Sequence, residues 1–256
     1  MKYSIKFFFN LLIISMLSIG LFSCDTEEQE ISITPNSSQS EPSTTSKNIQ
    51  SLNEVHLEII KGAIIIETQG LAAEAIEAAI IAYNQTEDFQ CGDYDEMSNE
   101  SNYSDSDVTS NYTSSFNWML VCTPNQVPSF LNYNRFTSGT YETKFLSSVD
   151  DSESTLKIQG ITETDDAYEI TGRYLRTGVQ ELNPPYSGSY DSNISIRIND
   201  LFVDKSTFEI LSGSANLILT GTSNGGTPYA FTAGVSLNGD GTVTIEVMNQ
   251  SHTFEL

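Results

Sequence analysis

The sequence predicts an α+β protein that is mainly β, with an amino-terminal helix or helix pair packed on an antiparallel β-meander. Two observations carry this prediction. After residue 107, apolar and polar residues alternate at period two, which is typical of strands with one buried face. Short turn segments such as Asn238-Gly239-Asp240-Gly241 separate the alternating stretches and favour hairpins. Such a chain is expected to fold as a curled open sheet or as a barrel.

Residues 1–23 have the layout of a bacterial lipoprotein signal peptide. Two lysines form a basic start, and the apolar core from Phe7 to Ile19 is too short to span a bilayer. The segment Leu21-Phe22-Ser23-Cys24 resembles a lipobox, although Phe22 departs from its usual small residue. We therefore expect cleavage before Cys24 and lipidation, including palmitate, of Cys24. The alternative is an ordinary secretory signal that leaves Cys24 a plain thiol.

The segment after Cys24 predicts location and reach. Acidic residues at positions 25, 27, 28 and 30 resemble the surface-export signal of Bacteroidota lipoproteins. This favours a cell-surface position on the outer membrane, with a periplasm-facing domain as the alternative. Residues 24–50 are rich in Ser, Thr, Asn, Gln, Pro and Glu and contain few apolar side chains, so we expect a disordered tether.

The charge of the chain limits its partners. The formal net charge is −23, and loss of the signal peptide would make it about two units more negative. So acidic a protein repels nucleic acid phosphates and anionic lipid headgroups. We therefore expect no nucleic acid partner, and membrane attachment through the lipid anchor. A protein or glycan partner stays open.

Residues 51–86 predict the helical part. Ser51-Leu52-Asn53-Glu54 fits a capping box, and apolar residues then recur at helical spacing until near Asn84. Gly70 interrupts the pattern, which predicts one broken helix or two helices. The β-branched run Ile64-Ile65-Ile66 leaves a strand as an alternative there. The apolar stripe is expected to dock on a sheet, with Glu67, Glu74 and Glu77 on the other side.

Residues 87–256 predict the β domain. A strongly acidic stretch from Glu87 to Asp107 precedes the first strand, and the segment Asp150-Asp151-Ser152-Glu153 predicts a turn. The predicted strands are Tyr112 to Cys122, Phe130 to Phe136, Thr140 to Leu146, Leu156 to Ile161, Tyr168 to Thr177, Ile194 to Ile198, Phe208 to Thr220, Tyr229 to Leu237, Thr242 to Val247 and His252 to Leu256.

Cys91 and Cys122 are predicted to form a disulfide. An exported protein folds where disulfides persist, and Cys24 is expected to carry lipid. Cys122 shares its predicted inward face with Trp118. Two buried free thiols or a metal-binding pair are the alternatives.

Candidate chemistry is sparse. His56 and His252 are the only histidines, and no GxSxG, HExxH or P-loop motif occurs. We therefore expect no enzymatic activity and no cofactor, with a hydrolase as a distant alternative. The carboxylates of Asp93, Asp95, Asp105 and Asp107 form a speculative calcium site, although acidic loops are commonly just solvated.

Tyrosines are the other candidate binding groups. Such side chains line platforms for sugars or peptides, but they are also common in strands because they pack well there. Packing is the favoured interpretation. The tyrosines considered are Tyr94, Tyr103, Tyr133, Tyr141, Tyr186, Tyr190 and Tyr229.

Several short motifs in the carboxyl-terminal half are similar to those of one family. They are Leu201-Phe202-Val203-Asp204-Lys205-Ser206-Thr207, Ser212-Gly213-Ser214-Ala215, Leu219-Thr220-Gly221-Thr222 and Asn238-Gly239-Asp240-Gly241-Thr242. This half resembles a group of uncharacterised, flavobacterial-type Bacteroidota lipoproteins. The resemblance extends weakly to Cys91-Gly92-Asp93 and to the strand ending at Cys122. It implies an exported lipoprotein with a carboxyl-terminal antiparallel β domain and transfers no catalytic residue.

Taken together, the sequence predicts a membrane-anchored, exported, non-enzymatic lipoprotein with a structural, adhesive or interaction role. The alternative is a module that binds a glycan, peptide or lipid inside the curled sheet.

Overall fold

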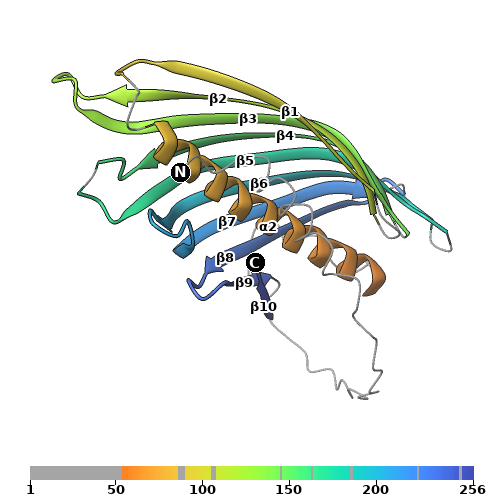
Figure 1. Cartoon of the computed structure of the whole chain (residues 1–256). Helices are drawn as coiled ribbons and strands as arrows, with labels where there is room; N and C mark the ends of the chain where they lie inside the picture. Colours follow the sequence, from red (N-terminus) through yellow and green to blue (C-terminus); the bar gives the residue numbers. More distant parts are fainter. Residues whose placement is uncertain are drawn as a thin grey trace, which may run out of the picture.

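The computed structural model describes residues 54–85, 90–104, 108–144, 146–162, 164–184, 187–223, 225–247 and 250–256. The predicted signal peptide, the lipidation site Cys24, the tether and the capping residues before Glu54 lie outside these ranges. The described residues form one long helix and a ten-stranded sheet (Figure 1).

The helix comes first and the strands follow along the chain. The elements are α2 (Glu54–Gln85), β1 (Tyr94–Ser104), β2 (Val108–Cys122), β3 (Pro128–Thr143), β4 (Leu146–Gln159), β5 (Ala167–Leu182), β6 (Ser189–Asp204), β7 (Ile210–Ser223), β8 (Pro228–Leu237), β9 (Thr242–Val247) and β10 (Gln250–Glu255).

The sheet is an open antiparallel meander. Its strands lie in the order of the sequence from β1 to β10, and every neighbouring pair is antiparallel. Within the described residues β1 pairs only with β2, and β10 only with β9, so the sheet does not close. The predicted mainly-β meander is confirmed as a curled sheet, and the barrel alternative is wrong.

α2 is a single helix that runs through Gly70 without a break. The predicted interruption is therefore wrong, and so is the alternative strand at Ile64–Ile66. One glycine in a helix costs only about 1 kcal/mol relative to alanine. The packing of the apolar residues on either side of Gly70 outweighs this cost, since Ile64 and Leu71 are both buried in the core.

The core lies between α2 and the face of the sheet that it crosses, which we call the inner face (Figure 1). The predicted docking of the apolar stripe is confirmed. The inner face is apolar toward one end of the strands, where Trp118, Leu156 and Ile170 are almost completely buried. From α2 the core includes Ile64, Leu71, Ala72, Ala75, Ala78, Ala79, Ile81 and Ala82.

The strands are longer than the sequence pattern predicted. The acidic segment Asp150–Glu153 is not a turn but the middle of β4. Buried and exposed side chains alternate along this segment, as in a strand: Asp150 points inward and is buried, whereas Asp151 and Glu153 are exposed. β3 likewise continues from the predicted strand Phe130 to Phe136 into the next predicted strand, but it ends at Thr143, and Leu146 begins β4. β1 was not predicted at all, because its acidic and amide side chains lack an apolar face.

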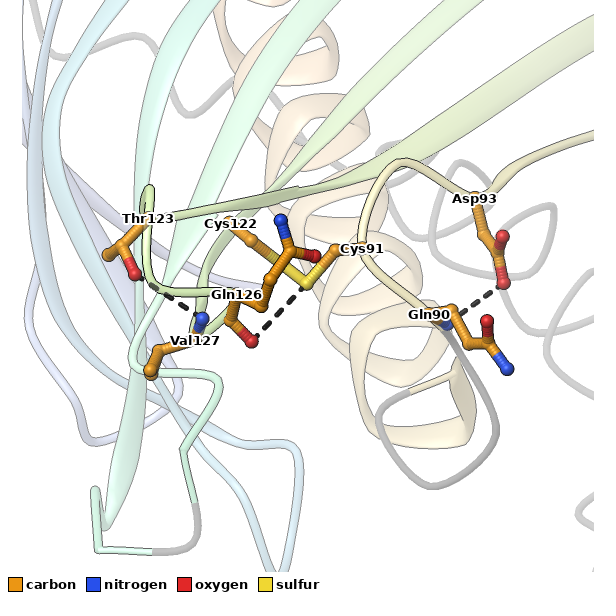
Figure 2. The surroundings of a disulfide bond; sticks show 7 residues. All are labelled: Gln90, Cys91, Asp93, Cys122, Thr123, Gln126 and Val127. Carbon is orange, nitrogen blue, oxygen red and sulfur yellow. Dashed lines mark hydrogen bonds between the residues drawn. A yellow bond between two sulfur atoms is a disulfide. The ribbon is translucent and has the colours of Figure 1, made fainter.

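The predicted disulfide between Cys91 and Cys122 is confirmed (Figure 2). It joins the segment before β1 to the end of β2, across a sequence separation of 31 residues. Such a cross-link stabilises the fold by about 3–4 kcal/mol in the chain-entropy model. Both cysteines are half-buried, beside the turn in which the Val127 amide donates to the Thr123 hydroxyl at 3.3 Å (Figure 2).

Glycines alternate with larger residues in one cross-strand row of the inner face. The ring of Tyr112 occupies the place that a Cβ at Gly139 would fill, and the ring of Tyr229 does the same at Gly221. A flat ring lying over a glycine hides backbone that would otherwise face the solvent. In order from β2 to β8 the row is Tyr112, Gly139, Asp150, Gly178, Ser192, Gly221 and Tyr229.

Alanine at either ring-covered glycine is expected to destabilise the protein. Gly139→Ala and Gly221→Ala should each lower the free energy of unfolding by about 1–3 kcal/mol, because the added Cβ would overlap a backbone carbonyl oxygen, of Asn111 or of Asp191, as well as the tyrosine ring. Urea unfolding measures the change. Gly234→Ala is the matched control, since no heavy atom lies within 4 Å of its added Cβ. An equal loss in all three variants would contradict the explanation by crowding at Gly139 and Gly221.

Candidate functional site

A layer of charged side chains lies between α2 and the sheet. We call it the charged layer and define it by Glu67, Glu74 and Glu77 of α2, Arg135 of β3, Asp150 of β4 and Arg176 of β5. The predicted placement of the three glutamates away from the docking side is wrong. Glu67 and Glu74 are buried, and the Glu77 side chain is only 14% exposed. The sheet attracts them because it places two arginines beneath the helix.

Arg176 joins the helix to the sheet. Its Nε lies 3.1 Å from Oε1 of Glu67, and its Nη2 lies 2.9 Å from Oδ2 of Asp150. The hydroxyl of Tyr174 donates to Oε2 of Glu67 at 2.7 Å, so both carboxylate oxygens of Glu67 are satisfied. Asp150 also accepts from the hydroxyls of Ser148 and Tyr112. Every member of this group therefore has a hydrogen-bonding partner, as a buried charge requires.

Arg135 makes the second connection. Its Nη1 donates to Oε2 of Glu77 at 2.7 Å, and its Nη2 donates to the hydroxyl of Ser114 at 3.2 Å. Glu74 lies close by and accepts a hydrogen bond from the Ser154 hydroxyl. The two arginines thus hold two points of α2, about three turns apart, over β3 and β5.

Carboxylates outnumber arginines by four to two in the charged layer. Burial raises the pKa of Glu67, Glu74 and Glu77, and the nearby guanidinium groups only partly oppose the rise. The proton of a buried glutamic acid removes an unfavourable buried charge. These glutamates consequently bind protons more readily than exposed ones, and they also connect the helix to the sheet.

The inner face becomes polar where the strands continue past the charged layer, and we call this region the polar end. It comprises the glycine-containing row from Tyr112 to Tyr229 and the next row outward. That second row runs through Tyr103, Ser110, Tyr141, Ser148, Gln180, Tyr190 and Ser223.

Hydroxyl groups of the polar end are mostly engaged within the protein. Tyr229 donates to the backbone carbonyl oxygen of Asp191 at 3.0 Å, and the Ser192 hydroxyl is hydrogen-bonded to the side-chain amide of Gln180 at 2.8 Å. Burial raises the pKa of Tyr141 to about 12, so this phenol stays protonated near neutral pH. The region offers hydrogen bonds and ring faces, the chemistry of binding rather than of proton transfer.

The predicted tyrosine set is divided by the fold. Tyr103, Tyr141, Tyr190 and Tyr229 do gather at the polar end, whereas Tyr133 is a core residue and Tyr94 is exposed on the edge strand. Tyr186 lies outside the described residues. Tyr112, which was predicted only as a strand residue, belongs with the tyrosines of the polar end.

The speculative calcium ligands do not converge within the described part of the chain. Asp93 accepts a hydrogen bond from the Gln90 amide, and Asp95 stands near the start of β1. The extended strand separates Asp95 from Ser104 by about 30 Å. Asp105 and Asp107 follow Ser104 in the chain and lie outside the described residues, so the geometry gives no support to one site built from all four.

Among the residues that the structure describes, no three His, Cys, Asp or Glu side chains are grouped to hold a metal ion. Neither does any helix in these ranges have the length and apolar character needed to cross a membrane.

No protein-family model, curated protein or solved structure matches this chain. The resemblance to flavobacterial lipoproteins therefore stays a prediction from the sequence motifs.

Removing Arg176 is expected to be costly. Arg176→Met leaves two carboxylates buried without their shared cation, and it should lower the free energy of unfolding by about 3–5 kcal/mol. Arg173→Met, three residues away on the exposed face of β5, is the matched control and should change it by no more than about 0.5 kcal/mol. Chemical denaturation compares them, and similar losses would contradict the structural role of the charged layer.

The raised glutamate pKa values predict that stability falls as the pH rises. The usual pKa of a glutamate is 4.5. Above this pH the folded protein still holds protons on these glutamates, whereas the unfolded chain has already released them. Unfolding then releases protons, so the melting temperature should be higher at pH 5 than at pH 8. Aspartates with lowered pKa values, such as Asp204, change the pH dependence of stability only in more acidic solution.

Glu74→Gln should raise the melting temperature at pH 8, since the amide carries no buried charge. It should also make the melting temperature depend less on pH. Exposed Glu246 provides the control, and Glu246→Gln should leave the slope unchanged. Calorimetry across pH 5–8 measures both variants, and a steeper slope in Glu74→Gln would refute the assignment.

Proposed function

We propose that the protein is an exported lipoprotein, anchored to the outer membrane through Cys24, whose β domain serves as a non-enzymatic interaction module at the cell surface. The signal-peptide layout and the acidic residues that follow Cys24 support the anchor and its location. The expected tether of residues 24–50 would give the domain reach beyond the membrane.

One structural observation supports the interaction role. The sheet face opposite α2, which we call the outer face, is a broad surface across strands of up to 16 residues. It carries many short polar side chains, as in Ser115 and Asn117 of β2, and exposed apolar ones, as in Phe136, Val149 and Ile218. The charged groups of the inner face, in contrast, pair with one another beneath the helix. A broad face that displays polar groups on a rigid support suits recognition of a partner with polar groups.

The anchor is tested by changing Cys24. Wild-type protein expressed in its bacterial host should incorporate an alkyne-labelled fatty acid and partition into the detergent phase of a phase-separating detergent. Cys24→Ser should lose the label and move to the aqueous phase, because a free secretory domain has no acyl chain. Labelling that persists in Cys24→Ser would refute the lipoprotein assignment, and protease resistance on intact cells would refute surface exposure.

A further inference from the structure

Two arginines stand directly opposite each other on the outer face. Arg173 of β5 pairs in register with Arg197 of β6, and both side chains are exposed. Like charges at directly opposite positions of an antiparallel pair repel and destabilise the sheet. Neither arginine has an ion-pair or hydrogen-bonding partner among the described residues. The sheet therefore holds a repulsive cationic pair that no internal contact offsets.

This pair is unusual in so acidic a chain. The sequence has 11 Lys and Arg against 34 Asp and Glu. Arg135 and Arg176 are buried under the helix. Lys157 of β4 lies diagonal to Arg173 on the outer face, because it pairs with Thr171, two residues before Arg173. Its Nζ lies 4.6 Å from the ring centroid of Phe130. The basic side chains of the strands on the outer face are thus gathered in one place.

The surroundings supply neutral hydrogen-bonding groups. The cross-strand row that contains both arginines runs Asn117, Asn134, Thr155, Arg173, Arg197 and Asn216. Next to Arg197, β6 carries a bulge at Asn199, which accepts from Asn216 at 3.3 Å. Bulges re-aim side chains and are common beside functional sites. Amides and hydroxyls in a line next to cations match a ligand that has hydroxyls next to an anion.

Two acidic groups lie nearest on the same face. Glu153 is diagonal to Arg173, and Asp200 follows the bulge after Arg197 and accepts from the Ser214 hydroxyl at 2.5 Å. Neither is within ion-pairing distance of the arginines in the described structure. More distant carboxylates are screened, because the Debye length is about 8 Å at physiological ionic strength.

We propose that Arg173 and Arg197, with Lys157 beside them, bind the phosphate or sulfate group of an anionic glycan on the outer face. Paired guanidinium groups match the oxygens of a tetrahedral anion. The amides and hydroxyls of the row would then contact the sugar hydroxyls. This inference deepens the proposed interaction role and rests on it for the use of the outer face. It does not depend on the lipid anchor.

Calorimetric titration of the detergent-solubilised full-length protein with glucose 6-phosphate tests the site. Wild type should bind this sugar phosphate more tightly than inorganic phosphate, and neutral glucose not at all. Arg173→Gln and Arg197→Gln should each weaken binding about tenfold, since each removes a charge-assisted contact. Lys47→Gln removes one positive charge from the expected tether and should leave affinity within about twofold. Absence of binding, or binding insensitive to both arginine changes, would overturn the site.

Two further measurements sharpen this test. Without ligand, Arg197→Gln should melt at the same temperature as wild type or higher, because it relieves repulsion; a lower melting temperature would show that the arginine has a structural role instead. Inorganic phosphate that binds as tightly as the sugar phosphate would overturn the glycan assignment. Fatty-acid labelling at Cys24 is measured separately, so failure of the anion site and failure of the anchor are distinguishable.

Discussion

The position of α2 on the sheet depends on ion pairing beneath the helix. Apolar packing alone leaves a helix free to slide along a wide face, because the hydrophobic effect has no direction. Arg176 and Arg135 remove this freedom, since each must meet a particular glutamate of α2 at hydrogen-bonding distance. A shift of one helical turn would leave charges buried without partners, at a cost of several kcal/mol. The charged layer thus sets the register of helix on sheet.

The change in polarity along the inner face follows from the position of α2. Strands of up to 16 residues extend well beyond the width of one helix, so α2 covers only part of their length (Figure 1). The covered end is apolar, the charged layer marks the transition, and the polar end carries hydroxyls and tyrosine rings. Glycines in that last region accept the rings of Tyr112 and Tyr229, which fills space that the helix does not reach. One gradient of polarity along the strands therefore accounts for helix position and for ring packing.

The sequence predicted the β-meander well because period-two alternation reports directly which side chains face the core, as with Phe116, Trp118 and Leu120 in β2. It failed where a buried residue was charged. Asp150 was interpreted as part of a turn and Glu67 as solvent-facing, since a single sequence does not show that Arg176 lies between them. Cross-strand register is likewise not apparent in the sequence, so the Arg173–Arg197 pair could not be predicted, and the candidate tyrosines could not be divided into core, edge and polar-end positions.

The open edges explain why such an acidic composition suits this fold. An unpaired strand edge invites pairing with another copy of the chain. β1 is a long edge, but Asp95, Glu96 and Glu100 are exposed along it. Two copies pairing through β1 would bring these carboxylates together, and like charges across strands repel. At the other edge, β10 spans only six residues. For a domain anchored to a membrane, as proposed, the acidic β1 edge keeps neighbouring copies apart, which leaves the outer face free for a different partner.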